Sequence, residues 1–87
     1  MAEFNIRWSK RAEKKLSKLS KEIARQVVHK VDSLGENPFR HLEHYSSGEC
    51  YKLRIGEYRA LIDVFFREMI LHVRILEHRK KIYKRKK

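Results

Sequence analysis

The hydrophobic period changes near the middle of this 87-residue chain, and that change limits the folds open to it. Before Gly35, apolar side chains recur at three- and four-residue spacing, which is typical of amphipathic helices. After Cys50 they alternate with polar side chains, which is typical of strands with one buried face. A chain of this length buries only roughly 60–65% of the surface exposed on unfolding, so it has one small core. The pattern therefore predicts one α+β domain over residues 1–87.

The first half predicts a short strand followed by a helical hairpin. Residues 4–8 alternate between apolar and polar types, as a strand with one buried face requires. Ser9 is a candidate N-cap for the first helix, and Ser20 divides that helix from the second. The second helix is expected to end at Gly35. Residues 37–48 are rich in Pro, Ser and Gly and predict a loop.

The second half predicts a three-stranded antiparallel meander. Its alternating segments are residues 51–55, 58–66 and 69–76. Gly56-Glu57 is a candidate tight turn, and Arg67-Glu68 is a weaker one. The expected architecture is therefore an N-terminal strand, a helical hairpin and a meander, followed by a basic C-terminal tail.

The register of the first hairpin places positive charges side by side. If the turn lies at 56–57, Arg54 faces Arg59 directly across the ladder, and the next strand places Arg74 opposite Leu61. Like charges in this position destabilise a sheet, whereas a bound phosphate would bond to both guanidinium groups. We therefore expect one sheet face to be apolar and the other to be basic, presenting Lys52, Arg54, Arg59 and Arg74.

The positive charge is concentrated toward the C-terminus. The formal net charge is +11, and residues 52–87 carry 12 Lys and Arg against four Asp and Glu. Clustered positive charge favours a nucleic acid partner, although a solvated basic face would have the same composition. In the tail, Tyr83 could stack on an RNA base, or Ile82 and Tyr83 could anchor the tail to the core. The sequence leaves both interpretations open.

Several common kinds of site are absent from the sequence. There is no Gly-rich phosphate loop and no zinc-binding His-Glu-x-x-His, so no metal or other cofactor is expected. The lone Cys50 cannot form an internal disulfide, and no apolar segment approaches the roughly 20 residues needed to span a membrane. We therefore expect a cytoplasmic protein.

A basic sheet face could still support catalysis. RNA can be cut without a metal when its own 2′-hydroxyl attacks the adjacent phosphate.

One segment resembles a known superfamily. Residues 50–59, Cys-Tyr-Lys-Leu-Arg-Ile-Gly-Glu-Tyr-Arg, followed by His78-Arg79 and Tyr83, resemble the RelE/ParE superfamily of bacterial and archaeal toxin–antitoxin modules. The resemblance covers nearly the whole chain and implies a RelE-like, microbial RNase-like fold. RelE toxins cleave mRNA in the ribosomal A site and are silenced by an acidic antitoxin. It therefore implies a ribosome-dependent mRNA endonuclease whose partners are the ribosome, mRNA and a cognate acidic antitoxin, with which it forms a hetero-oligomer.

The resemblance also implies roles for individual residues. Arg59 resembles the arginine that stabilises the transition-state phosphate, and Arg79 the second catalytic arginine or general acid. Lys52 and Arg54 match a basic pair on the preceding strand; an arginine at 54 is a poor general base because it hardly deprotonates. Tyr83 resembles a tyrosine that orients the nucleotide or helps activate the hydroxyl, and His78 is an alternative acid. The expected RNA-binding residues are Arg74, Lys80, Lys81, Lys84 and Arg85.

Two alternatives predict different activities. A ParE-like toxin inhibits a topoisomerase by binding and needs no catalytic residues. A non-catalytic RNA- or ribosome-binding protein would bind in a salt-dependent way without cutting. The arginine and tyrosine after the last strand favour the RelE-type activity.

Overall fold

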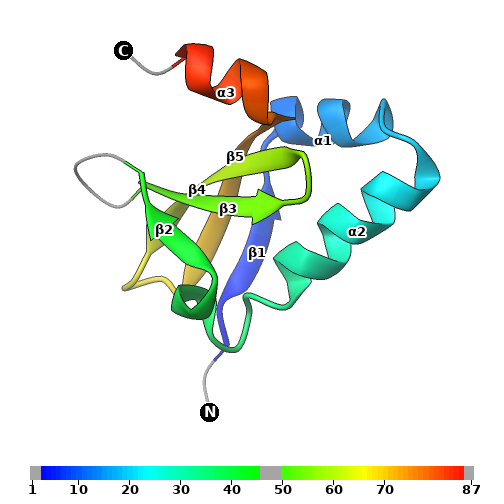
Figure 1. Cartoon of the computed structure of the whole chain (residues 1–87). Helices are drawn as coiled ribbons and strands as arrows, with labels where there is room; N and C mark the ends of the chain where they lie inside the picture. The colour runs from blue at the N-terminus through cyan, green and yellow to red at the C-terminus, as the bar shows by residue number, and fades with distance from the viewer. Residues whose placement is uncertain (1–2, 46–49, 86–87) are drawn as a thin grey trace.

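The computed structural model describes residues 3–45 and 50–85, with side chains described as far as Ile82 at the C-terminal end. The described chain has the expected α+β architecture, built on a mixed five-stranded sheet in the order β1-β5-β4-β3-β2 (Figure 1). Strand β1 runs parallel to β5, and the other neighbours are antiparallel. The elements are β1 (Asn5–Trp8), α1 (Lys10–Ser17), α2 (Lys21–Asp32), the 3-10 helix η1 (Pro38–Arg40), β2 (Leu42–His44), β3 (Cys50–Ile55), β4 (Tyr58–Phe65), β5 (Ile70–His78) and α3 (Arg79–Arg85).

Both helices of the first half begin at a serine cap: Ser9 caps α1, as predicted, and Ser20, which was predicted only to divide the two helices, caps α2. The Ser9 hydroxyl accepts a hydrogen bond from the backbone N–H of Ala12 at 3.0 Å, and that of Ser20 accepts one from Ile23 at 3.3 Å. Each serine satisfies an N–H group that has no partner within its helix. The Ser9 hydroxyl also donates to the backbone oxygen of Arg74 at 2.7 Å, which ties the start of α1 to β5.

The main core lies between the helices and one face of the sheet. Alternate residues of β3 and β4, and of β5 as far as Val73, point toward α1 and α2, which confirms this part of the apolar face predicted from the period of two. Beyond Val73 an irregularity in β5 places Leu76 on this face instead of the predicted Ile75. Full burial of each such aliphatic side chain contributes roughly 1.5–3 kcal/mol. The largest fully buried side chains in this core are Leu34, Leu53, Ile62, Leu71 and Leu76.

The segment predicted as a loop contains two short elements. Within residues 37–45, η1 is followed by β2, which pairs with β3 so that Glu43 faces Lys52. The prediction of a plain loop was wrong because a three-residue strand has too little alternation to be seen in the sequence, and its partner strand β3 comes later in the chain. The remainder of the predicted loop, 46–48, lies outside the described residues.

The register of the last hairpin differs from the prediction because β5 contains a β-bulge. Ile62 pairs with Val73, but Leu61 pairs with Ile75, so Arg74 is the extra residue and does not face Leu61. A bulge inserts one residue into one strand, and the alternation of side chains does not reveal it.

The basic C-terminal segment is helical rather than an extended tail. Helix α3 packs against β4 and β5, where Ile82 is fully buried beside Cys50 and Leu61. The predicted apolar anchor is therefore present at Ile82. The second sheet face is not uniformly basic, because α3 covers part of it.

Candidate functional site

The turn between β3 and β4 organises the candidate site. Gly56 has φ +57° whereas Glu57 does not have a positive φ, the pattern of a type II′ turn with Gly at its first central position. The ladder pairs Ile55 with Tyr58 and Arg54 with Arg59, which confirms the predicted register. The turn therefore brings the two arginines to one end of the sheet.

Arg59 differs from the expectation of an exposed basic side chain. Its side chain is only 3% exposed, and Nη1 donates to the backbone oxygens of Gly56 and Tyr58, both at 2.7 Å. Its Nε is buried without a hydrogen-bond partner among the described residues. The prediction of exposure was wrong because a register fixes where the backbone lies, while a long side chain can fold back onto nearby turn carbonyls.

Arg54 and Lys52 lie on the second sheet face, the one turned away from α1 and α2, as predicted. Arg54 is exposed, and Lys52, two residues earlier on β3, is partly buried with Nζ 3.9 Å from Glu43 of β2. Alternate residues on one strand lie on the same face, so these two cations are neighbours.

Arg79 begins α3 directly beside the turn, as predicted for the chain after the last strand. Its backbone N–H donates to the Glu57 backbone oxygen at 2.8 Å, and its Nε lies 3.0 Å from Glu57 Oε1. The side chain is 48% exposed, so it can reach a ligand in solution. Arg54 and Arg79 therefore approach the same turn from β3 and from α3.

His78 joins this group with a defined orientation. Its Nδ1 accepts a hydrogen bond from the backbone N–H of Lys80 at 3.2 Å, so the neutral ring carries its proton on Nε2. That Nε2 lies 3.8 Å from Glu57 Oε1, and the ring meets Tyr58 edge to face with centroids 5.4 Å apart.

Arg74 belongs to a different cluster farther along β5. Its Nε lies 3.4 Å from Asp63 Oδ2, and its Nη2 donates to Cys50 Sγ at 3.1 Å. Burial raises the pKa of the Cys50 thiol, and the Arg74 hydrogen bond and charge partly offset this rise. His78 lies four positions beyond Arg74 on β5, a rise of roughly 13 Å, so the structure does not bring Arg74 to the turn.

The remaining predicted residues lie on α3. Lys80 and Lys81 are exposed on its first turn. Tyr83, Lys84 and Arg85 fall within the helix, but their side chains lie outside the described part of the structure.

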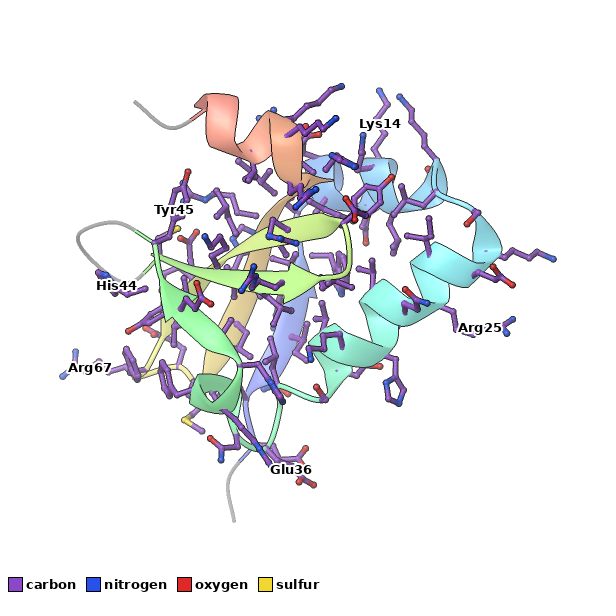
Figure 2. All side chains as sticks on the ribbon, in the orientation of Figure 1. Lys14, Arg25, Glu36, His44, Tyr45 and Arg67 are labelled. Carbon is purple, nitrogen blue, oxygen red and sulfur yellow. The ribbon has the colours of Figure 1, made fainter. Side chains whose placement is uncertain are left out.

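A second basic surface lies along α1. Arg11, Lys14 and Lys15 of α1 and its C-cap residue Lys18 line a groove of 260 Å³ together with Leu76 and Glu77 of β5. Lys15 Nζ lies 3.6 Å from Glu77, while Lys14 points away from the sheet (Figure 2).

Within residues 3–45 and 50–85 there is no group of His, Cys, Asp and Glu side chains that could hold a metal ion. In the same residues, no helix is both long and apolar enough to cross a membrane.

Sequence reasoning did not find Glu57 as a site residue, because its contacts with His78 and Arg79 join parts of the chain that are about twenty residues apart.

Comparison with known proteins places these features in a family. The family model described as the ParE toxin of the type II toxin–antitoxin system, parDE, matches residues 6–83. Among curated proteins, no sequence relative matches the chain.

Solved structures share the fold. A RelBE toxin–antitoxin complex from Mycobacterium tuberculosis contains a chain with TM-score 0.80 and 22% identity, covering 88% of this chain and 99% of that one. A RelE–RelB complex from Pyrococcus horikoshii gives TM-score 0.75 and 20% identity, covering 87% and 94%. A mutant of the Escherichia coli toxin RelE in the free state gives 0.73 and 26%, covering 97% and 93%.

Proposed function

This chain belongs to the ParE toxin family, within the RelE/ParE superfamily of type II toxin–antitoxin toxins, and we propose that it acts as the RelE branch of that superfamily does, as a ribosome-dependent mRNA endonuclease. The observation that supports this activity most strongly is the approach of Arg54 and Arg79 to one turn, with His78 beside them. Two exposed guanidinium groups at the same end of the sheet form a surface suited to a phosphate diester.

The proposed reaction needs no metal. The 2′-hydroxyl oxygen of the RNA attacks the adjacent phosphorus, the P–O5′ bond breaks, and a 2′,3′-cyclic phosphate and a 5′-hydroxyl result. Arg54 and Arg79 bind the non-bridging oxygens and stabilise the extra negative charge of the transition state. One proton leaves the 2′-hydroxyl and one reaches the 5′-oxygen; Lys52, His78 and Tyr83 are the proposed carriers, with Tyr83 also orienting the nucleotide.

Arg59 contributes to this site from beneath the surface. Its charge adds to the positive potential around Arg54 without touching solvent. Its hydrogen bonds to Gly56 and Tyr58 also fix the turn. A direct contact between Arg59 and the phosphate, as the family resemblance implies, requires the guanidinium to leave these two carbonyls when RNA binds.

The proposed partners are all anionic. With a net charge of +11, the protein is suited to mRNA, to ribosomal RNA and to an acidic antitoxin in a hetero-oligomer, in the cytoplasm where ribosomes work. Lys80 and Lys81, with Lys84 and Arg85, extend the RNA-binding surface along α3. Arg74 is a weaker candidate, because Asp63 and Cys50 already engage its guanidinium.

The test uses purified protein on programmed ribosomes and on the same naked mRNA, with the new RNA ends mapped. We expect cuts only on ribosomes, slowed about 100-fold or more in Arg54→Ala and in Arg79→Ala. Arg25→Ala is the matched control. It removes the same charge, and Arg25 points outward from α2 (Figure 2). Intact mRNA bound to a folded wild-type protein would contradict the proposal.

A ParE-like activity is the second candidate, favoured by the description of the matched family model. It predicts DNA damage in cells that produce the protein, inhibition of a topoisomerase and unchanged mRNA. A purely RNA-binding protein would instead bind ribosomes with a steep salt dependence, without cleavage and without DNA damage.

A further inference from the structure

The carboxylate of Glu57 lies beside Arg79 and His78 in the proposed phosphate-binding surface. It is 66% exposed, and its Oε1 is 3.0 Å from Arg79 Nε and 3.8 Å from His78 Nε2. A negative charge in this place repels RNA. A structural or chemical gain must therefore offset that repulsion.

The carboxylate meets only one side of the Arg79 guanidinium. A guanidinium has five N–H donors, one on Nε and four on the two Nη atoms. Oε1 of Glu57 engages the Nε side. Among the described residues, Glu57 is the one side chain with which Arg79 forms an ion pair, so the Nη donors can face a phosphate in the two-pronged geometry that arginine favours.

The backbone that carries Glu57 is itself held in place. The backbone oxygen of Glu57 accepts from Arg79 N–H at 2.8 Å, and Arg59 Nη1 bonds to the carbonyls of Gly56 and Tyr58 on either side. A carboxylate on a braced two-residue turn orients its partner better than one on a free loop, because less side-chain and backbone freedom remains.

We propose that Glu57 is a positioning residue, whose carboxylate orients Arg79 so that its two Nη groups face the scissile phosphate of RNA. This inference rests on the proposed endonuclease function. It assigns Glu57 two opposite effects: its charge weakens RNA binding, and its hold on Arg79 speeds the chemical step. Neither a purely structural residue nor a purely repulsive charge would produce both effects.

The first experiment measures steady-state cleavage by Glu57→Gln, with the concentration of programmed ribosomes varied. We expect kcat to fall about tenfold because Arg79 is less well oriented, while KM falls because the repulsion is gone. Glu68→Gln is the matched control: it removes the same charge from an exposed residue in the other hairpin turn, and kcat should not change. A lower KM with unchanged kcat in Glu57→Gln would overturn the proposal.

A double-mutant cycle shows whether Glu57 acts through Arg79. In an Arg79→Ala background, Glu57→Gln should have no further effect on kcat, because the group that it positions is absent. An additional tenfold loss would mean that Glu57 acts elsewhere. Glu57→Asp, which keeps the charge on a shorter side chain, should recover part of the lost kcat.

A measurement without cleavage separates this inference from the proposed function. The Nε–Hε NMR signal of Arg79, assigned by its disappearance in Arg79→Lys, should shift and exchange faster with water in Glu57→Gln but not in Glu68→Gln. An unchanged signal would overturn the positioning role even if the wild type cleaves mRNA. If the wild type binds RNA without cleaving it, the endonuclease proposal fails. In that case an added RNA oligonucleotide should still shift the Arg79 Nε–Hε signal of the wild type. An unshifted signal would then overturn the positioning role of Glu57 as well.

Discussion

The two hairpin turns at the ends of β4 are closed by different interactions. At the β3–β4 turn, Arg59 bonds to two backbone carbonyls and Glu57 pairs with Arg79. At the β4–β5 turn, the N–H of Met69 donates to the Phe66 backbone oxygen at 3.3 Å, and the Phe66 ring stacks on Phe39 with centroids 5.6 Å apart.

The two turns differ in the kind of side chain that they present. The first turn presents charged side chains whose orientation is set by hydrogen bonds, which are directional. The second presents aromatic rings that are nearly half exposed, and Arg67 extends from this end of the sheet, far from Lys14 (Figure 2). Apolar contacts close a turn without fixing the orientation of a polar group, so of the two turns the first is the one suited to the proposed phosphate.

The largest expected effect comes from the paired arginines of the first turn. Arg59→Ala should lower the free energy of unfolding by about 2–4 kcal/mol, because it removes charge-assisted hydrogen bonds and leaves a cavity. Arg54→Ala, directly opposite, should change it by no more than about 0.5 kcal/mol because that side chain is exposed. Urea denaturation of both variants measures the difference.

Arg59→Lys tests the cause of that loss. It keeps the charge but cannot reproduce the guanidinium geometry, so we expect a stability between wild type and Arg59→Ala. Equal losses in Arg59→Ala and Arg54→Ala would show that the hydrogen bonds to the turn carry no stability.

The backbone conformations of the two turns predict changes of opposite sign. Gly56 and Met69 both have φ near +57°, and residues with a Cβ rarely adopt a positive φ. Gly56→Ala should therefore destabilise by about 1 kcal/mol, although the added Cβ meets nothing within 4 Å. Met69→Gly should stabilise by about 0.5–1 kcal/mol.

Thermal melting checks both variants, since 1 kcal/mol shifts Tm by about 4–8 °C in a domain of this size. A lower Tm for Met69→Gly would show that the methionine side chain packs well enough to outweigh its strained backbone.

The difference between the turns also marks what can be predicted from sequence. The first turn was predicted with its register because Gly56 and the alternation of β3 and β4 are local signals. The folding of Arg59 onto its own turn and the pairing of Glu57 with Arg79 were not predicted, since they depend on side-chain orientation and on a partner far along the chain. The Ser9 cap, the helix break at Ser20 and the apolar core were predicted for the same local reasons, whereas strand β2 and the bulge at Arg74 required three-dimensional pairing.

The exposed aromatic residues of the second turn provide a matched pair. Phe65 and Phe66 are 42% and 44% exposed, but only Phe66 stacks on another ring among the described residues. Phe66→Ala should therefore cost about 0.5–1.5 kcal/mol more than Phe65→Ala. Urea denaturation measures both, and equal costs would show that the stack with Phe39 does not help to close this end of the sheet.

The smallest expected effect lies between the two turns, in the cluster of Cys50, Asp63 and Arg74. Burial raises the pKa of Cys50, Arg74 lowers it and Asp63 raises it. Arg74→Gln should therefore raise the pKa of the thiol further, and Asp63→Asn should lower it. The pH dependence of alkylation by iodoacetamide measures both, because only the thiolate reacts. Neither change should alter the Glu57–Arg79 pair, whose Arg79 Nε–Hε signal serves as the control; a shift of that signal would mean that the middle of β4 is coupled to the first turn.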